Sequence, residues 1–474
     1  MELPMTVSVE NPLLTALGEV LPPHALLTDE AELARHSRDA APFGAAGRPA
    51  VVVCPETVEE VQHVVRTARA RGVAVVPQGA RTGLAGAANA VTGCVVLSMT
   101  RMNRILEIDT GNRLVRCEPG VVTADLAAAV AGEGLCYPPD PASFETCTIG
   151  GNIATGAGGL CCVKYGVTAD YVLGLTVVLA DGEVLRVGRN TVKGVAGYDL
   201  TRLFVGSEGT LGVIVEATLA LVPPRPPALA LLARFASTAD AGEAVGAIIR
   251  EGHVPSALEL LDRATTRAVA ALGHPLLGGD RTEAAATLIV ASDAPDARER
   301  VRAMTELCRD AKALSVTAAE DEEQTGQVLR ARRMVMPALA AHAGAGDREV
   351  TAFIEDVAVP RARLAVLIEQ IEQIAQEHDL FIATVGHAGD GNLHPTVVFD
   401  PADPSAVRRA KDAYDAIMAA ALELGGTITG EHGVGTLKRD WLARELSPRS
   451  LRLHRDVKRL LDPEGLLNPG KVLA

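Results

Sequence analysis

Three histidines and one glutamate stand in settings that suit metal-assisted acid–base chemistry. His387 and His394 lie on either side of a Gly-Asp-Gly-Asn turn. If strands flank this turn, both imidazoles can converge on one ion. Glu431 and His432 begin a Glu-His-Gly-Val-Gly motif, which adds a carboxylate and a third imidazole. Two histidines and one carboxylate with open coordination positions suit zinc, manganese or iron(II).

Each of these motifs, taken alone, has a simpler explanation. Histidines that cap a hairpin account for the spacing of His387 and His394 as well as a metal site does. Solvated surface side chains account for Glu431 and His432. A metal-assisted catalytic site therefore becomes the better explanation only if the sequence also contains a second kind of functional site.

Three glycine-rich segments provide that second site, at residues 77–86, 148–159 and 206–214. Small residues let backbone N–H groups approach a pyrophosphate closely. None of the segments is a Walker A loop or a Rossmann fingerprint. One such turn alone is explained by a tight connection between elements. Three of them within one region imply a large, phosphate-bearing cofactor that lies along the backbone.

The elements around these segments divide into two kinds. Residues 49–110 alternate short apolar strands with a helix, and residues 172–222 form strands with a hairpin closed by Asp181-Gly182. Four prolines between residues 223 and 227 then predict a domain boundary. The expected strands are 51–54, 73–76, 95–98, 287–292, 350–359 and 380–385, and the expected helices are 57–71, 239–250, 295–311, 364–376 and 405–424. After the boundary this pattern predicts an antiparallel sheet with helices on one face.

Composition excludes several classes of function. The formal net charge is −14 and aromatic residues make up 3% of the 474 residues, which argues against nucleic acid as a partner. We expect no secretory signal and no transmembrane segment, because no apolar stretch reaches the ~18 residues that a span needs. Eight cysteines without a C-x-x-C pair argue against zinc ribbons and iron–sulfur clusters and fit the reducing cytoplasm. A peripheral position at the inner face of the membrane is the alternative location.

The order of these segments resembles the vanillyl-alcohol oxidase/p-cresol methylhydroxylase superfamily. The tail motifs GHAGDGNLHP, ITGEHGVG and LLNPGKVL are most similar to the branch of FAD-linked 2-hydroxy acid dehydrogenases that contains the glycolate oxidase catalytic subunit, D-lactate dehydrogenases and D-2-hydroxyglutarate dehydrogenases. The resemblance runs from about residue 48 to the end. It implies an α+β chain, with a two-part FAD-binding domain of the p-cresol methylhydroxylase type and an antiparallel-sheet substrate (cap) domain. The expected parts are an N-terminal helical segment (1–45), the FAD-binding domain (46–224), the substrate domain (228–424) and a C-terminal segment that returns to the FAD domain (425–474).

The resemblance also assigns roles to residues. It places metal ligation on His387, His394 and Glu431, the base role on His432, and binding of the substrate carboxylate on Arg332. The implied FAD contacts are Pro77, Gly79, Ala80, Arg81, Thr82, Gly83, Leu84, Pro139, Asp140, Thr148, Gly150, Gly151, Asn152, Thr155, Gly158, Gly209, Ile214 and Asn468. No histidine lies between residues 70 and 90, so FAD is expected to bind non-covalently. Ala80 replaces a glycine that is common in the first loop of the family.

The implied reaction is the oxidation of a small 2-hydroxy acid, with a divalent metal (zinc first, manganese or iron as alternatives) beside FAD. Positions that carry a threonine, a lysine and an asparagine in 2-hydroxyglutarate enzymes correspond here to Met336, Ile354 and Thr396. A second carboxylate would lack its cation, which favours glycolate or D-lactate over D-2-hydroxyglutarate. Electrons would leave through a partner subunit, a quinone or a cytochrome, and a homodimer is the default expectation for the assembly.

Two functions of other classes remain as alternatives. A metal-dependent hydrolase without flavin would use the histidines and the glutamate but would leave the glycine-rich segments without a role. A non-catalytic flavoprotein subunit would use the FAD domain but not the histidine motifs.

Overall fold

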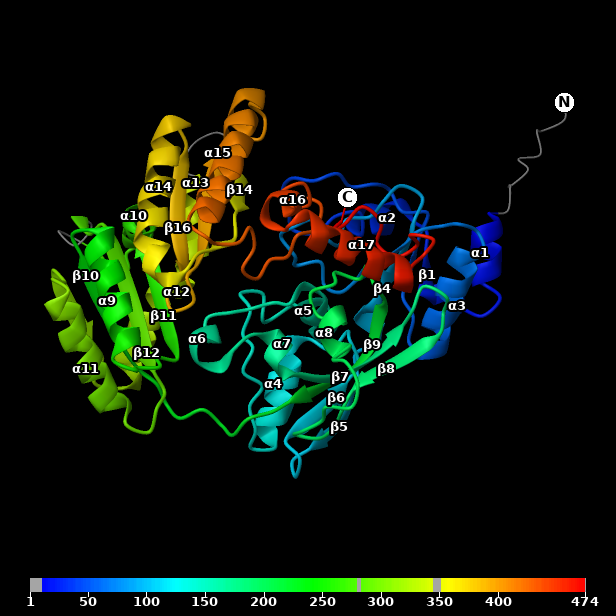
Figure 1. The fold of residues 1–474 in the computed structure, drawn as a ribbon, viewed down its shortest axis with the longest axis horizontal. Helices are drawn as coiled ribbons and strands as arrows, with labels where there is room; N and C mark the ends of the chain where they lie inside the picture. The colour runs from blue at the N-terminus through cyan, green and yellow to red at the C-terminus, as the bar shows by residue number, and fades with distance from the viewer. Residues whose placement is uncertain (1–10, 279–282, 344–350, 474) are drawn as a thin grey trace, which may run out of the picture.

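The computed structural model describes residues 11–278, 283–343 and 351–473. Figure 1 shows two lobes: one contains a large sheet covered by helices, and the other contains two smaller sheets. The C-terminal segment, drawn in red, crosses back and lies over the lobe with the two smaller sheets. Among the described residues, no helix combines the length and apolar character needed to cross a membrane.

The first small sheet has the strand order β1-β2-β4-β3. Its strands are β1 (Leu26–Leu27), β2 (Val51–Val53), β4 (Val95–Ser98) and β3 (Val75–Gln78). β2, β4 and β3 are parallel, and α3 (Val58–Arg69) makes the crossover between β2 and β3. The N-terminal segment was expected to be helical. It contributes α1 (Pro12–Leu17), α2 (Glu30–Arg35) and also β1, which pairs antiparallel with β2; residues 1–10 lie outside the described residues.

The second small sheet has the order β5-β6-β9-β7-β8 and is antiparallel throughout. Its strands are β5 (Ile105–Asp109), β6 (Leu114–Cys117), β9 (Val213–Ala220), β7 (Val172–Val178) and β8 (Val184–Gly188). The predicted hairpin is confirmed: β7 and β8 pair, and Gly182 turns between them with a φ of 80°. Helices α4 (Thr123–Gly132), α5 (Ile149–Thr155), α6 (Cys162–Tyr165), α7 (Thr168–Tyr171) and α8 (Thr201–Phe204) complete this part.

The large sheet is antiparallel, with the order β13-β10-β12-β11-β16-β17-β14, and β15 also pairs with β17. Its strands are β13 (Ser315–Ala318), β10 (Leu229–Phe235), β12 (Ala286–Ser292), β11 (Ala257–Asp262), β16 (Phe381–His387), β17 (Asn392–Phe399), β14 (Thr351–Ile354) and β15 (Val357–Ala358). No strand is shared between this sheet and the two small ones in the described residues. The division at the proline cluster remains a prediction.

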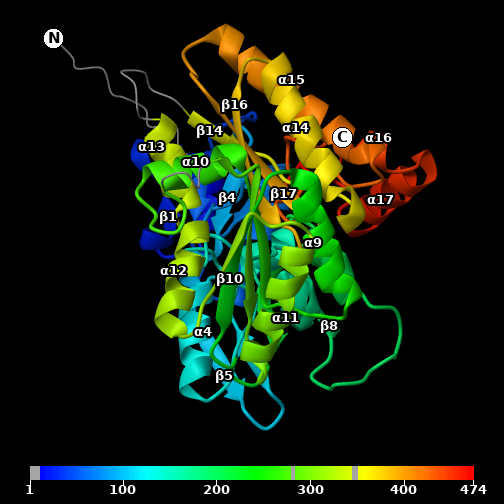
Figure 2. The ribbon, with the colours of Figure 1, turned by 90° about the vertical axis from the view of Figure 1, so that its left-hand side faces the viewer.

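Helices cover both faces of the large sheet, which differs from the single layer that we expected. One layer contains α9 (Thr238–Arg250), α11 (Ala297–Asp310), α14 (Leu364–Glu377) and α15 (Pro404–Glu423). The other contains α10 (Arg263–Ala271), α12 (Glu322–Arg333) and α13 (Val335–Ala343). Figure 2 shows α12 and α11 on opposite sides of β10. Every residue of β11 and β12 is buried, so both faces of the sheet need cover. The second layer was missed because α12 is largely polar, with only Thr325, Val328 and Ala331 buried, and because short apolar runs such as α13 do not reveal their helical period.

The C-terminal segment joins the first small sheet after α16 (Leu442–Glu445) and α17 (Pro448–Leu461). Leu467 forms a parallel bridge to Val75 of β3. The amide of Val75 donates to the carbonyl of Leu466 over 2.9 Å, and the amide of Asn468 donates to the carbonyl of Val75 over 2.8 Å. The end of the chain therefore extends the sheet whose strand β3 leads into the first glycine-rich segment.

Candidate functional site

One cavity is lined by all three glycine-rich segments. The predicted cofactor contacts that line it are Pro77, Gly79, Ala80, Arg81, Thr82, Gly83, Leu84, Thr148, Gly150, Gly151, Asn152, Thr155, Gly158, Gly209 and Ile214. Glu431 and His432, which come from the C-terminal segment, line the same cavity. The structure thus brings the expected cofactor segments and part of the expected catalytic motif into one space.

The first of these segments follows β3 and presents free backbone donors. The amides of residues 80 to 84 donate no hydrogen bond to another described residue. Arg81 adopts a left-handed conformation with a φ of 60°, which turns successive N–H groups toward one side. Consecutive N–H groups of this kind form a concave anion site. Because these half-buried donors have no partner within the chain, they are available for the phosphates of FAD.

Glycines allow the segments to approach one another closely. A Cβ atom at Gly79 would lie 2.3 Å from Oγ1 of Thr148, and a Cβ atom at Gly150 would lie 2.4 Å from Cβ of Pro119. No side chain can occupy such positions without displacing its neighbours. The first and second glycine-rich segments therefore form adjacent walls of the cavity.

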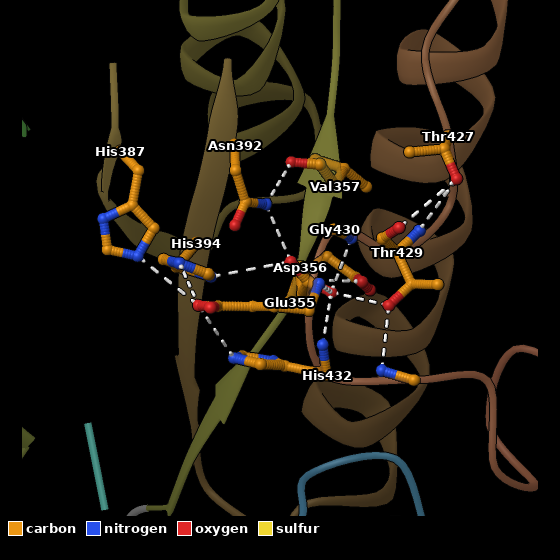
Figure 3. A network of polar contacts seen from close by, with 12 residues as sticks. Glu355, Asp356, Val357, His387, Asn392, His394, Thr427, Thr429, Gly430 and His432 are labelled. Atoms are coloured by element: carbon orange, nitrogen blue, oxygen red, sulfur yellow. Dashed lines mark hydrogen bonds and ion pairs between the residues drawn. The ribbon is translucent and has the colours of Figure 1, made fainter. Parts of the chain in front are cut away.

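The four candidate catalytic residues form one cluster. β16 ends at His387 and β17 begins at Asn392, so the turn between them places His387 and His394 on neighbouring strands. Nε2 of His387 lies 3.4 Å and Nε2 of His394 lies 3.1 Å from Oε1 of Glu431. Nε2 of His432 lies 3.9 Å from the same oxygen. In Figure 3 the imidazoles of His387, His394 and His432 lie close together and point toward one another.

The contacts of the ring nitrogens indicate which atoms are available for a metal. Nδ1 of His387 lies 2.6 Å from Oε1 of Glu259, so the other ring nitrogen faces the cluster. Nδ1 of His394 is buried and has no hydrogen-bond partner. A carboxylate behind a metal-binding histidine is the arrangement that orients such ligands. His387, His394 and Glu431 therefore fit a divalent cation.

A second group of possible ligands, Asp356, His394 and His432, also lies within coordination range. Oδ2 of Asp356, however, accepts hydrogen bonds from the hydroxyl of Thr429 at 2.6 Å and from the amides of Gly430, Glu431 and His432 at 2.8, 3.0 and 2.9 Å. Its Oδ1 accepts from the side-chain amide of Asn392. The carboxylate of Asp356 is thus already taken up by these donors. Its role is to hold the loop that carries the Glu-His motif (Figure 3).

Burial and neighbouring charges shift the pKa values of the cluster. Burial lowers the pKa of His432 to about 4, so this imidazole is neutral near pH 7. Burial also opposes the charge on His387, but the carboxylates of Glu259 and Glu431 outweigh it and hold the pKa of His387 well above its usual value. In the same way, His387 and His394 outweigh burial at Glu431 and hold its pKa well below the usual value.

Arg332 lies near the cluster but does not line the cavity among the described residues. It belongs to α12, and its Nε donates to Oε2 of Glu259 over 2.7 Å. The same carboxylate contacts His387, so a single residue, Glu259, links Arg332 to one of the candidate metal ligands.

Three further predicted FAD contacts lie outside the cavity lining, namely Pro139, Asp140 and Asn468. Oδ1 of Asp140 accepts from the amide of Cys161 over 3.1 Å. The side-chain amide of Asn468 donates to the carbonyls of Ala87 and Glu208 over 2.9 and 2.7 Å. Asn468 braces two walls of the cavity from behind.

The sequence analysis missed three buried carboxylates that support the site. Glu259 and Asp356 are 1% and 0% exposed, and Glu208 is 6% exposed. Glu208 accepts from the amides of Val434 and Gly435 over 2.6 and 2.8 Å, which joins the third glycine-rich segment to the Glu-His loop. The available signal was a charged residue inside an apolar strand, as in SALELLD and FIEDVAVP.

Comparison with known proteins identifies the family of the chain. The FAD binding domain model matches residues 49–188, and the model of the FAD linked oxidases, C-terminal domain, matches residues 226–472. The glycolate oxidase subunit GlcD of Bacillus subtilis is 41% identical over 431 residues, which cover 90% of this chain and 89% of the relative. The D-lactate dehydrogenase of Anaerostipes hadrus is 35% identical over 465 residues, which cover 96% of this chain and 95% of the relative.

The structure of p-cresol methylhydroxylase with substrate bound superposes with a TM-score of 0.77 at 19% identity, covering 97% of this chain and 96% of the other. This likeness confirms the predicted fold class. Together, the matched models and relatives show that the chain belongs to the family of FAD-linked oxidases, as a member with both the FAD-binding domain and the C-terminal domain of that family.

Proposed function

We propose that this protein is an FAD-dependent dehydrogenase that oxidises a small D-2-hydroxy acid, glycolate or D-lactate, to the 2-oxo acid. The observation that carries the proposal is that one cavity is lined both by the glycine-rich segments and by Glu431 and His432. A cofactor held by the former would face the base and a metal ligand.

The glycine-rich walls would hold FAD without a covalent bond. The free amides of residues 80 to 84 fit its phosphates, and Gly158 lines the cavity next to Glu431. Bound FAD supplies the hydride acceptor for the alcohol carbon.

His387, His394 and Glu431 would hold a divalent cation, with zinc as the first choice because two histidines and a carboxylate suit it. A cation there lowers the pKa of the substrate hydroxyl and orients it. The protein's own part is to keep both imidazole Nε2 atoms and one carboxylate oxygen directed at the same point.

His432 would act as the base that takes the hydroxyl proton, at the Nε2 atom that lies on the side of Glu431. A neutral imidazole is required for this role, and burial of His432 favours the neutral form. The hydrogen bond from the amide of His432 to Asp356 fixes the position of the loop. The ring of His432 stacks on the ring of His394, with centroids 5.0 Å apart, which limits its rotation.

Arg332 would bind the substrate carboxylate. Its Nε is occupied by Glu259, which leaves the Nη donors of the guanidinium for a bidentate pair. The positions that would hold a second carboxylate carry Met336, Ile354 and Thr396, and the last two are cross-strand neighbours in β14 and β17. None of these side chains is a cation, which favours a monocarboxylate over D-2-hydroxyglutarate.

The electron acceptor would be a partner subunit, a quinone or a cytochrome. The name of the Bacillus subtilis relative describes that protein as a subunit, which supports a partner subunit here. A cytoplasmic location, with contact to the inner face of the membrane as an alternative, remains our expectation.

The two rival functions receive less support. A metal-dependent hydrolase leaves the cavity with its free amides unexplained. A non-catalytic flavoprotein subunit does not need His387, His394 and His432 directed at one carboxylate.

The experiment is to replace His432 by alanine and to mix the anaerobic flavoprotein with substrate. We expect full FAD content, with flavin reduction slowed by at least about 100-fold, the usual scale of general-base catalysis. His454→Ala, at an exposed histidine of α17, is the control and should behave as wild type. Unchanged flavin reduction in His432→Ala would contradict the base assignment.

A further inference from the structure

One buried carboxylate contacts two residues of the candidate site at once. Oε1 of Glu259 lies 2.6 Å from Nδ1 of His387, and its Oε2 lies 2.7 Å from Nε of Arg332. Both partners are nearly enclosed: the side chains of His387 and Arg332 are 7% and 16% exposed. His387, the candidate metal ligand, and Arg332, the candidate for binding the substrate carboxylate, therefore contact the same carboxylate.

The strand register explains this position. Glu259 of β11 pairs directly with His387 of β16 in the antiparallel ladder, so the two side chains project from the same face. Leu261 of β11, two positions along, packs on that face against the helical layer that contains α12. Arg332 comes from α12 and reaches Glu259 from above the sheet.

The cost of burying Glu259 argues for a specific task. It is the one charged side chain between Ala257 and Leu261, in a strand that is buried throughout. A buried carboxylate is costly unless it is paired, and its removal would leave a buried arginine without a partner. Glu259 lines no part of the described cavity.

We propose that Glu259 is a positioning residue that couples the metal site to the substrate-binding arginine. It holds His387 with Nδ1 toward the carboxylate and Nε2 toward Glu431, and it holds Arg332 through Nε so that the Nη donors face substrate. This inference rests on the proposed function, because it assumes a cation at His387 and a carboxylate at Arg332.

Glutamine cannot replace both contacts. If its NH₂ group faces Arg332, two donors meet; if it faces Nδ1 of His387, that nitrogen must accept, which moves the imidazole proton to Nε2, the atom proposed for the metal. Glu259→Gln therefore disturbs one of the two contacts while it preserves side-chain volume. Glu259→Asp keeps the charge but is one methylene shorter, which makes it a second variant if the glutamine protein does not fold.

The first measurement is zinc affinity. The FAD-loaded full-length protein is stripped of metal with a chelator and titrated with Zn²⁺ against a competing dye. We expect Glu259→Gln to bind zinc about 10- to 100-fold more weakly than wild type, with unchanged FAD content. The control is Glu216→Gln, which removes a carboxylate that pairs with Arg116 in the other lobe.

The second measurement separates coupling from a general structural effect. The KM for glycolate or D-lactate is measured at saturating zinc for wild type, Glu259→Gln, Arg332→Met and the double variant. If Glu259 acts through Arg332, the double variant should have the same KM as Arg332→Met alone. Additive effects on KM, or unchanged zinc affinity in Glu259→Gln, would overturn the inference. A wild-type protein that binds no zinc and is reduced by no hydroxy acid would instead contradict the proposed function itself.

Discussion

Gly158 lies so close to Glu431 that a larger residue at its position requires the Glu431 carboxylate to move. A Cβ atom at Gly158 would lie 2.2 Å from Oε2 of Glu431 and 3.2 Å from its Cβ. Gly158 belongs to the second glycine-rich segment and Glu431 to the C-terminal segment, which are 273 residues apart in the sequence. The cofactor wall and the candidate metal ligand are thus in direct contact.

This contact predicts the effect of Gly158→Ala. The added methyl group must displace the Glu431 carboxylate, because its Cβ atom would lie 2.2 Å from Oε2 and that oxygen is at the flexible end of the side chain. We expect zinc affinity and the rate of flavin reduction to fall at least about 10-fold, with the flavin absorbance of the purified protein retained. Gly132→Ala, at a helical glycine with no atom within 4 Å of the added Cβ, is the control. Wild-type zinc affinity in Gly158→Ala would show that Glu431 is not held as described.

Asp356 is expected to be the main support of the Glu-His loop. Asparagine at this position cannot accept on one oxygen from a hydroxyl and three amides with the strength of a carboxylate. We predict that Asp356→Asn lowers the free energy of unfolding by about 2–4 kcal/mol and slows flavin reduction by about 100-fold. Urea unfolding and anaerobic stopped-flow absorbance measure the two effects. The control is Asp403→Asn, at the N-cap of α15. It should lower the free energy of unfolding by no more than the usual cost of a changed helix cap and should leave the rate of flavin reduction unchanged.

Metal removal should separate cofactor binding from chemistry. The proposed metal ligands and the free amides of residues 80 to 84 are different parts of the cavity region. Dialysis against a chelator should therefore leave the flavin spectrum unchanged and abolish its bleaching by substrate, and added Zn²⁺ or Mn²⁺ should restore bleaching. Full activity in a protein shown by elemental analysis to contain no metal would rule out the metal-assisted account.

Stability should depend on pH through Asp262. This carboxyl caps α10, accepts the amides of Thr265 and Thr384 over 2.7 Å each, and has its pKa raised to about 6 by burial. The folded pKa lies above the unfolded value of 3.8, so the stabilisation is fully present below about pH 4 and is lost as the pH rises through 6. The difference in unfolding free energy between wild type and Asp262→Asn should therefore shrink by up to about 3 kcal/mol from pH 4 to pH 7. If the difference in unfolding free energy between wild type and Asp262→Asn does not change with pH, the raised pKa of Asp262 is contradicted.

Local patterns were sufficient to predict much of this molecule. The prediction that His387 and His394 converge depended on strands flanking the Gly-Asp-Gly-Asn turn; β16 and β17 do flank it, and the centroids of the two imidazole rings lie 5.1 Å apart. The glycine-rich segments were found because they contain more small residues than packing alone explains. Glu259 could not be found in this way, because its partner His387 lies 128 residues away and is reached only through strand pairing.

The second helical layer shows the same limit. Most residues of α12 are polar or charged, and only Thr325, Val328 and Ala331 are buried. Such a narrow apolar stripe gives only a weak helical periodicity in the sequence. Its position depends on the fully buried strands β11 and β12, whose second face had to be covered.

The central claim is that one cavity holds FAD beside a site that oxidises 2-hydroxy acids. The most direct test is the visible absorbance spectrum of the purified protein under anaerobic conditions, before and after addition of glycolate, D-lactate, L-lactate and D-2-hydroxyglutarate. We predict a flavin spectrum that glycolate or D-lactate bleaches, and that D-2-hydroxyglutarate bleaches more slowly. A colourless protein that also fails to bind added FAD would contradict the account.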